Sequence, residues 1–394
     1  MQLLDALERE LSERAASGLS RRRRVLSGAQ GPRIVADGRP LLAFASNDYL
    51  GLANHPEIVA ATREALAQWG VGSGASHLLS GHFEPHEALE HALAAFIAPC
   101  EDARALTFST GYLANLAILT ALAGRHDAIF ADRLNHACLN DGALLSRAQF
   151  LRYAHNDVGA LARLLETTRA RRRIIATDAV FSMDGDVAPI AELLALARRH
   201  DALLLIDDAH GFGVLGRGRG TAAELELRSE RLLVMGTLGK AAGVSGAFVT
   251  GHRVIVETLL QTARSYIYTT AAPPALAAGL LRSLSLLRDG DALRAHLFAL
   301  IERLQHGLQG LPWSLLPSRT AIQPLIVGGN EAALRLSEAL WQRGIWAPAI
   351  RPPTVPPGTA RLRISLSAAH AMQDIDALVA ALHDAHATGD ARVA

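Results

Sequence analysis

The stretch Leu203–Gly211 (LLLIDDAHG) joins four consecutive aliphatic residues to two acids and a histidine. A short, unbroken apolar run is typical of a strand that is buried on both faces of a parallel sheet. In folds of this kind, ligands bind at the carboxyl ends of the strands. We therefore expect Asp207 and His210 to face a ligand, and Asp208 to be an exposed loop acid.

Strands and helices alternate on both sides of this stretch. Apolar runs predict seven strands, over Ala105–Phe108, Ala128–Ala131, Phe150–Tyr153, Arg173–Thr177, Ala202–Asp207, Leu232–Thr237 and Gly246–Thr250. Helical spacing of apolar residues predicts helices over Pro56–Gln68, Pro85–Ile97, Tyr112–Leu122, Val158–Glu166 and Pro189–Arg199. Strands separated by crossover helices predict an α/β fold with a mainly parallel seven-stranded sheet flanked by helices.

The two ends of the chain follow other patterns. An amphipathic helix over Met1–Ser20 precedes two short strands joined by a turn at Asp37-Gly38. Later elements are a long helical region, a strand, a helix, an alternating strand and a last helix, over Pro273–Gln309, Gln323–Val327, Asn330–Arg343, Arg361–Ser367 and Ala369–Ala387. We expect an N-terminal helix and short strands over residues 1–46, a large domain over 47–290 and a smaller C-terminal α+β domain over 291–394.

Composition argues against several classes of protein. The net charge is +1, so no overall field favours nucleic acid or an anionic membrane. Cys100 and Cys138 do not make a disulfide framework, which favours a reducing compartment. Asp5 and Glu8 precede the first basic cluster, a charge order that does not suit a signal peptide. We expect a cytoplasmic protein that binds neither nucleic acid nor membrane.

Lys240 is the only lysine of the chain, since every other residue of the Lys+Arg total is an arginine. Arginine can replace lysine as a solvated charge, but its guanidinium is never deprotonated and cannot form an imine. A single lysine between the apolar Leu232–Val234 run and two glycines, Gly243 and Gly246, indicates a Schiff-base residue. The alternative is a surface lysine that escaped replacement.

A lysine of this kind, downstream of a buried acid, is what pyridoxal phosphate requires. Asp207 would keep the pyridine nitrogen protonated, so that the ring accepts electrons, and His210 would hydrogen-bond the phenolic oxygen. The helix start at Ser109–Tyr112 and the hydroxyl of Thr237 would bind the phosphate. His136, just beyond a strand, would stack on the ring.

Other ligand motifs are weaker. Five glycines between Gly211 and Gly220 suggest a dinucleotide fingerprint, but no convincing helix follows them and no acidic ribose partner stands where one is expected. No spacing of His, Cys and Asp resembles a zinc site, and neither a nucleophile elbow nor a Walker loop is present. We therefore predict pyridoxal phosphate and no metal.

Several segments together resemble the α-oxoamine synthases, a family of fold-type-I pyridoxal-phosphate enzymes. The resemblance extends over essentially the entire chain, and its segments are Ser46–Leu52, Gly72–Gly74, Phe181–Asp186, Asp207–Gly211, Thr237–Lys240 and Ile350–Pro356. It implies a decarboxylative Claisen condensation of L-alanine with a pimeloyl thioester in biotin biosynthesis, with coenzyme A or acyl carrier protein as the carrier. It also implies a homodimer with the active site at the subunit interface.

The resemblance assigns roles residue by residue. It makes Lys240 the Schiff-base residue and general base, and His136, Asp207 and His210 the other catalytic residues. The expected cofactor contacts are Gly111, Tyr112, His136, Ser182, Asp207, His210, Thr237 and Lys240. The expected substrate contacts are Arg21, Asn47, His136, Thr354 and Arg363.

Two of these assignments have rivals. Arg363 is expected to bind the carboxylate of the amino acid, and Arg361 lies on the same strand face. Thr269 or Thr270 is expected to reach the phosphate in the neighbouring subunit.

The chain also departs from the family pattern. Asp178 stands where the family has Glu, Ala179 stands where it has Gly, and Ser76–Gly81 is unusual. These departures concern the positioning of the substrate. Sister enzymes that use glycine or serine, an aminotransferase, and a non-catalytic binding protein on the same fold are the alternatives.

Overall fold

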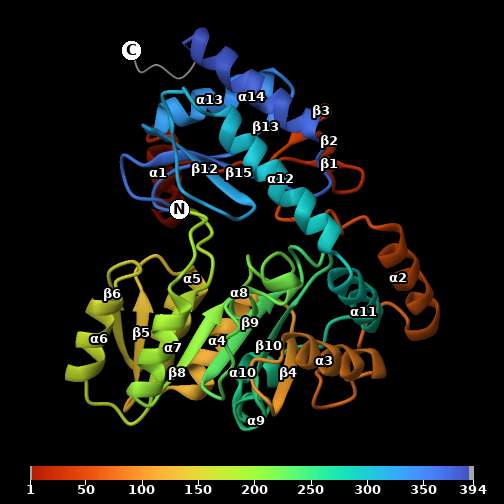
Figure 1. Cartoon of the computed structure of the whole chain (residues 1–394), viewed down its shortest axis with the longest axis vertical. Coiled ribbons are helices and arrows are strands. Elements are labelled where there is room, and N and C mark those ends of the chain that lie inside the picture. Colours follow the sequence, from red (N-terminus) through yellow and green to blue (C-terminus); the bar gives the residue numbers. More distant parts are fainter. Residues whose placement is uncertain (1, 390–394) are drawn as a thin grey trace. The chain divides into compact units, whose positions relative to one another are not determined.

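The computed structural model describes residues 2–389 of the chain, which divides into two compact units (Figure 1). The larger unit consists of Leu50–Ser182 and Asp186–Ala295, and the smaller unit of Met1–Tyr49, Met183–Gly185 and His296–Ala394. The N-terminal segment thus shares a unit with the C-terminal elements, a grouping that no local sequence pattern indicates. Within the described residues, no helix has both the length and the apolar character needed to cross a bilayer.

A seven-stranded sheet forms the centre of the larger unit. Its strand order is β4-β10-β9-β8-β7-β5-β6, with β10 antiparallel to both neighbours and every other pair parallel. The strands are β4 (Ala103–Phe108), β5 (Ala128–Asp132), β6 (Gln149–Tyr153), β7 (Arg173–Asp178), β8 (Ala202–Asp207), β9 (Leu232–Thr237) and β10 (Ala247–His252). The predicted fold class is confirmed, with each strand close to its expected bounds.

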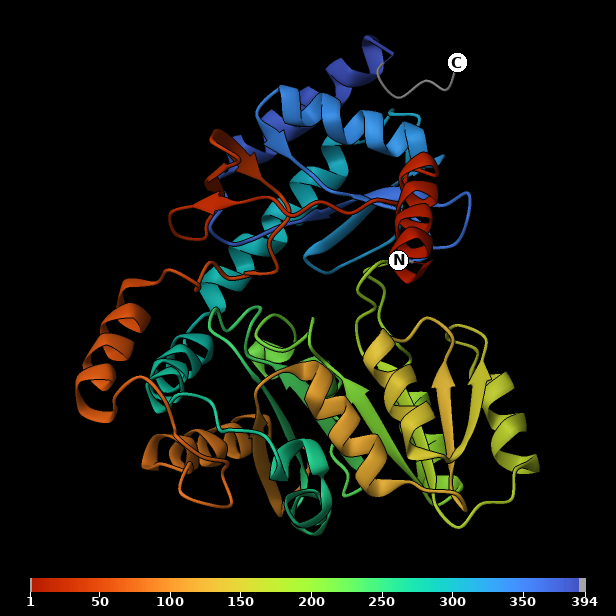
Figure 2. The same cartoon turned by 180° about the vertical axis from the view of Figure 1, so that it is seen from behind.

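Helices cover both faces of this sheet. α7 (Ile190–Arg199) lies on the face seen in Figure 1, and α4 (Gly111–Leu122) lies on the opposite face, seen in Figure 2. This cover explains the unbroken apolar run of β8, in which Leu204, Leu205 and Ile206 are fully buried. The carboxyl ends of the parallel strands are therefore the edge at which side chains can meet a ligand.

The predicted helices are present with small shifts at their ends. They are α2 (Pro56–Trp69), α3 (Glu84–Ile97), α4, α6 (Val158–Thr167) and α7. The sequence did not predict α5 (Ala137–Ser146), α8 (Thr221–Glu224), α9 (Arg253–Thr262) and α10 (Arg264–Ile267). α5 contains Asn, Asp and Gly, which weaken the helical signal.

The predicted helical region 273–309 is two helices, α11 (Pro274–Arg288) and α12 (Asp291–Gly307). The break includes Gly290, and glycine has a low helix propensity. Arg294 closes the break, because its guanidinium donates to the carbonyl of Leu287 at 2.8 Å and pairs with Asp291 at 2.7 Å.

Two four-stranded sheets belong to the smaller unit. One has the order β1-β2-β3-β13, with β1 (Leu26–Ser27), β2 (Arg33–Ala36), β3 (Arg39–Ala43) and β13 (Ile345–Trp346). The other has the order β11-β12-β15-β14, with β11 (Ser314–Leu315), β12 (Ile322–Gly328), β15 (Ala360–Ser365) and β14 (Ala349–Ile350). The predicted turn between β2 and β3 is present, and its residues Asp37 and Gly38 have φ of 49° and 79°, as a tight hairpin requires.

The helices of the smaller unit include α1 (Gln2–Ala16), α13 (Asn330–Gln342) and α14 (Met372–Ala387). α1 buries none of its residues and leaves Leu3, Leu4, Leu7 and Leu11 exposed. The strand predicted at Arg361–Ser367 is present as β15, and every residue of β15 is buried despite its alternating sequence. Both faces of this strand are therefore covered.

Candidate functional site

A cavity of about 200 Å³ lies in the larger unit, lined by residues that end or follow strands of the central sheet. Its lining comprises Gly111, Tyr112, His136, Cys138, Asp178, Ser182, Asp207, Ala209, His210, Met235, Thr237 and Lys240. The structure thus brings together every residue that the sequence assigned to the cofactor. β4, β5, β7, β8 and β9 point the same way, so residues beyond their carboxyl ends converge.

Lys240 lies in a tight turn between β9 and β10. Backbone hydrogen bonds close the turn, from the Gly243 N–H to the carbonyl of Lys240 and from the Leu238 N–H to the carbonyl of Gly246, both at 2.8 Å. Gly243 has φ of 73°, and a Cβ there would lie 2.5 Å from backbone of a neighbouring segment, so the position requires glycine. Nζ of Lys240 lies 2.8 Å from Nε2 of His210. The only lysine and the predicted histidine are therefore in contact.

Asp207 ends β8 and is nearly buried, with 6% of its surface exposed. Its Oδ2 accepts a hydrogen bond from Nδ2 of Asn115 at 2.7 Å, and its Oδ1 accepts one from the N–H of Ala209 at 3.0 Å. The sequence reasoning did not assign Asn115 to the site. The signal that could have identified it is an amide in the middle of an otherwise apolar helix.

Asp208 corrects a prediction. The sequence reasoning treated it as an exposed loop acid, but it is 1% exposed and accepts hydrogen bonds from the N–H and the hydroxyl of Thr221, both at 2.6 Å. Burial raises the pKa of Asp208 to about 7, although the bonds from Thr221 oppose the shift. A Cβ at Gly211 or Gly220 would lie 2.1 Å from this carboxylate. These two glycines therefore make room for the buried carboxylate of Asp208. Their presence is explained without a dinucleotide site.

His136 caps the start of α5, where its Nδ1 accepts from the N–H of Cys138 at 3.3 Å and lies 2.9 Å from the Cys138 sulfur. The backbone N–H of His136 donates to Oδ2 of Asp178 at 3.0 Å. Burial, together with the charge of Asp207, raises the pKa of Asp178 well above its usual value. Asp178, one of the departures from the family pattern, thus orients the residue that was predicted to stack on the ring.

The start of α4 is the predicted phosphate site. Thr110 is the N-cap and accepts a hydrogen bond from the N–H of Leu113 at 3.2 Å, while Gly111 and Tyr112 line the cavity. First-turn N–H groups have no partner within their own helix and favour an anion. The hydroxyl of Thr237, on the same cavity, donates to the carbonyl of Gly246 at 3.1 Å.

The remaining predicted substrate residues belong to the smaller unit. Arg21 and Thr354 line a second cavity of about 140 Å³, together with Arg14, Leu19 and the 349–353 segment. Asn47 precedes Tyr49 in the loop after β3, and Oδ1 of Asn47 accepts from Nη1 of Arg363 at 3.1 Å.

The two arginines of β15 differ in their partners. Arg361 pairs with the carboxylate of Asp184 at 2.7 Å. Arg363 donates to Asn47 and to the hydroxyl of Ser365, the latter at 2.8 Å. Because its charge is already matched by Asp184, Arg361 is the weaker candidate for binding a second carboxylate.

A histidine cluster lies elsewhere in the larger unit. The spacing of His77, His82 and His86 did not predict a metal site, yet the fold brings one ring nitrogen of each within 4.8 Å of the others. Hydrogen bonds already use these rings. Nδ1 of His86 accepts from the N–H of Phe83 at 3.1 Å and its Nε2 lies 2.8 Å from the carbonyl of Ala272. A bound cation would therefore have to displace one of these two contacts of His86.

The main cavity has the donor set that pyridoxal phosphate needs. It offers the primary amine of Lys240, the buried carboxylate of Asp207, whose oxygens are already oriented by two donors, and the imidazoles of His136 and His210. A helix start provides amide groups for a phosphate. The residues present thus fit this cofactor.

Comparison with known proteins points the same way. Residues 39–382 match the model of the family described as aminotransferase class I and II. A relative from Nitrosomonas europaea named 8-amino-7-oxononanoate synthase is 61% identical over 97% of this chain and 99% of its own length.

Two solved structures share the fold. One is SPT (serine palmitoyltransferase) with PLP, which has a TM-score of 0.92, is 30% identical and covers 99% of both chains. The other is 8-amino-7-oxononanoate synthase from Francisella tularensis, which has a TM-score of 0.75, is 31% identical and covers 88% of this chain and 98% of its own.

The chain belongs to the class I and II aminotransferase family, whose members are fold-type-I pyridoxal-phosphate enzymes. Within this class, its full-length similarity is to the 8-amino-7-oxononanoate synthases.

Proposed function

We propose that this protein condenses L-alanine with a pimeloyl thioester to give 8-amino-7-oxononanoate, carbon dioxide and the free thiol carrier, a step of biotin biosynthesis. The observation that carries the proposal is the 61% identity, over 97% of the chain, to a relative named for that product. The contents of the main cavity support it, because they are the groups that the chemistry requires.

The cofactor of this reaction is pyridoxal phosphate. When bound, it supplies an aldehyde that holds the substrate amino group and a ring that withdraws electrons from the alanine Cα. Lys240 would hold the cofactor through Nζ. The same amine, when free, would take the Cα proton of alanine and later return a proton to the product. His210, 2.8 Å from Nζ, keeps the amine directed into the cavity.

Asp207 and His136 would both contact the ring of the cofactor. The Asp207 carboxylate would accept a hydrogen bond from the protonated ring nitrogen of the cofactor and stabilise its positive charge. Asn115 and the Ala209 N–H hold that carboxylate still. His136, which lines the same cavity, would stack on the ring of the cofactor and exclude water from it. Ser182, Thr237, Gly111 and Tyr112 provide the remaining polar contacts.

Substrate recognition is assigned to the smaller unit. Arg363 binds the carboxylate of alanine, because a guanidinium matches that group with two parallel hydrogen bonds. Asn47 orients the Arg363 guanidinium. Arg21 and Thr354, which share a cavity, contact the pimeloyl thioester. Arg21 and its neighbouring arginines suit either the phosphates of coenzyme A or an acidic carrier protein.

The active enzyme is proposed to be a cytoplasmic homodimer in which Thr269 or Thr270 reaches the phosphate of the neighbouring subunit. Thr270 is exposed, and it pairs with Ser76 through an isolated bridge. The nearby Tyr268 is 71% exposed and Leu79 is 82% exposed. Large apolar groups left on a surface favour association. Size-exclusion chromatography with light scattering tests the dimer, and an active monomer would contradict it.

Purified protein should be incubated with pyridoxal phosphate and with alanine, glycine or serine, each combined with pimeloyl-coenzyme A and with the pimeloyl acyl carrier protein. The expected result is one thiol and one carbon dioxide per alanine consumed. Exclusive use of glycine or serine would overturn the assignment of substrate. The ratio of kcat/KM for the two thioesters identifies the carrier.

An aminotransferase is the second candidate, favoured by the description of the matching family. It predicts transfer of the amino group to a keto acid without loss of carbon dioxide. Incubation of the holoenzyme with alanine and 2-oxoglutarate, followed by assay for pyruvate, separates the two reactions.

A further inference from the structure

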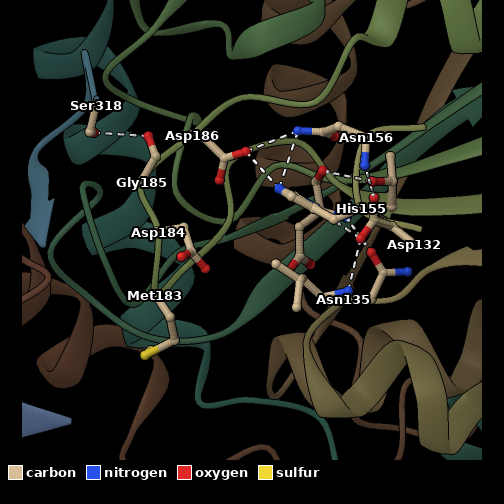
Figure 3. A network of polar contacts seen from close by, with 12 residues as sticks. Asp132, Asn135, His155, Asn156, Met183, Asp184, Gly185, Asp186 and Ser318 are labelled. Carbon is tan, nitrogen blue, oxygen red and sulfur yellow. Dashed lines mark hydrogen bonds and ion pairs between the residues drawn. The ribbon is translucent and has the colours of Figure 1, made fainter. Parts of the chain in front are cut away.

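His155 lies between two carboxylates, outside the lining of the main cavity. It follows β6, and its Nδ1 is 3.1 Å from Oδ1 of Asp132 while its Nε2 is 2.8 Å from Oδ2 of Asp186 (Figure 3). The ring also stands edge-on to that of Phe181, with the centroids 4.4 Å apart. Since both ring nitrogens face carboxylate oxygens, both donate, and the imidazole carries a positive charge.

The surroundings of His155 agree with this charge. Burial alone would lower its pKa, but the hydrogen bonds and the negative charges of Asp132 and Asp186 raise it to about 10. Asp132 is fully buried, and its carboxylate also accepts the N–H groups of Leu134 and Asn156, both at 2.8 Å. At neutral pH, His155 therefore joins the two acids by charge-assisted hydrogen bonds.

On one side, His155 fixes the turn that carries His136. Asp132 ends β5 and begins this turn, in which its Oδ1 accepts the N–H of Leu134. Further along the turn, the N–H of His136 donates to Asp178 at 3.0 Å, and Oδ1 of Asn135 accepts the N–H of Asp178 at 3.1 Å. The placement of the His136 ring thus depends on a turn whose first residue is held by His155.

On the other side, His155 fixes the turn that carries Ser182. Asp186 closes this turn, because its carbonyl accepts the N–H of Phe181 at 3.0 Å. Val180 and Val187 flank the turn and pair through an isolated antiparallel bridge. A shift of Asp186 would therefore move Ser182 relative to the cavity.

We propose that His155 is a positioning residue that keeps His136 and Ser182 in place around the cofactor, acting through Asp132 and Asp186. The link to the cofactor rests on the roles proposed above for His136 and Ser182. The mechanical part, that one imidazole ties two turns together, rests on the contacts of His155 alone.

The substitution His155→Gln tests both parts. Glutamine carries no charge and its single amide group cannot reproduce two opposed ring N–H donors. In the apoprotein, hydrogen–deuterium exchange followed by mass spectrometry should show faster exchange in residues 132–136 and 180–187. The dissociation constant for pyridoxal phosphate, from fluorescence titration, should rise roughly 10- to 100-fold, because binding would then have to restore the order that two charge-assisted hydrogen bonds supply. The visible circular dichroism of the bound cofactor should weaken.

Asp127→Asn is the matched control. Asp127 is a fully buried acid just before the other end of β5, and it pairs with Arg171 at 2.9 Å. This variant should lose stability without changing exchange in the two turns or the affinity for pyridoxal phosphate. Unchanged exchange in His155→Gln would overturn the mechanical part. Faster exchange with the original affinity and dichroism would overturn the link to the cofactor.

If His155→Gln does not fold, Asp186→Asn replaces it. The Asp186 side chain is 29% exposed, so the loss of its charge is tolerated better than a change at the centre of the network. It should raise the dissociation constant for pyridoxal phosphate in the same direction, with faster exchange in residues 180–187. An affinity equal to that of the original protein would overturn the proposal.

Discussion

Nδ2 of Asn115, on α4, lies 2.7 Å from Oδ2 of Asp207, at the end of β8, and both residues are buried. Nδ2 of Asn115 also lies 3.0 Å from the sulfur of Cys138, whereas no partner for its Oδ1 is found among the described residues. The orientation of the Asn115 amide is thus set by its two acceptors, the carboxylate of Asp207 and the sulfur of Cys138. A hydrogen bond to an ionised carboxylate favours the charged form and fixes its direction.

The substitution Asn115→Leu should lower kcat roughly 10- to 100-fold, because a buried carboxylate loses a donor while the side-chain volume is kept. It should also change the absorbance of the bound cofactor, because the Asp207 carboxylate would lose the amide donor that orients Oδ2. Steady-state kinetics and the pH dependence of the bound cofactor's absorbance are the measurements.

Thr120→Ala, an exposed change on the same helix, is the control for Asn115→Leu. It removes only a hydrogen bond to the carbonyl of Leu116, so kcat and the spectrum should stay as they are. An Asn115→Leu enzyme with unaltered kcat would show that Asp207 needs no second donor.

Lys240→Arg should keep a positive charge beside His210 and abolish both the visible absorbance of the lysine-linked cofactor and turnover. The reason is that a guanidinium neither bonds covalently to the aldehyde nor accepts the Cα proton. Borohydride reduction of the unaltered holoenzyme should attach the cofactor to residue 240, as peptide mass spectrometry can establish. Turnover retained in Lys240→Arg would show that Lys240 is neither the Schiff-base residue nor the general base.

The inner strands of the sheet, such as β8, could be predicted because they are apolar runs bounded by polar residues and are buried on both faces. α5 escaped prediction because its cap is His136 and its middle is Asn, Asp and Gly, so its helical conformation depends on packing. The break between α11 and α12 depends on Arg294, whose hydrogen bonds to backbone carbonyls leave no local pattern.

Within the site, sequence could identify residues but not their surroundings. Asp207 and Asp208 are adjacent acids after one strand, and only the N–H of Thr221, 13 residues away, reveals why the second is buried. Asn115 is 92 residues from Asp207, so no spacing rule connects them. Similarly, the pairing of Arg361 with Asp184 spans 177 residues.

Arg363→Lys should raise the KM for alanine roughly 10- to 100-fold, because an ammonium keeps the charge but loses the two-pronged geometry that a carboxylate matches. Arg361→Lys should change that KM much less, since Arg361 already pairs with Asp184 at 2.7 Å. Steady-state kinetics with alanine as the varied substrate compares the two variants. A larger KM effect in Arg361→Lys would exchange the roles of the two arginines.

Glu90 predicts a pH dependence of stability. It lies on α3, is 6% exposed and accepts the N–H and the hydroxyl of Thr107 at 2.7 and 2.8 Å. Burial raises its pKa from 4.5 to about 7, although the bonds from Thr107 oppose the shift. Between these two pH values the folded state keeps a proton that the unfolded state releases, so the free energy of unfolding falls as pH rises and levels off above pH 7.

Glu90→Gln keeps the shape and both acceptor contacts but cannot ionise. Its advantage in free energy of unfolding over the unaltered protein should therefore grow from pH 4.5 to about pH 7, by about 3 kcal/mol at most. Urea unfolding of the holoenzyme followed by circular dichroism at several pH values measures this difference. Glu84→Gln, an exposed change on the same helix, is the control, and its difference in free energy of unfolding from the unaltered protein should not vary with pH. A Glu90→Gln difference that does not vary with pH would mean that Glu90 ionises as readily in the folded protein as in the unfolded chain.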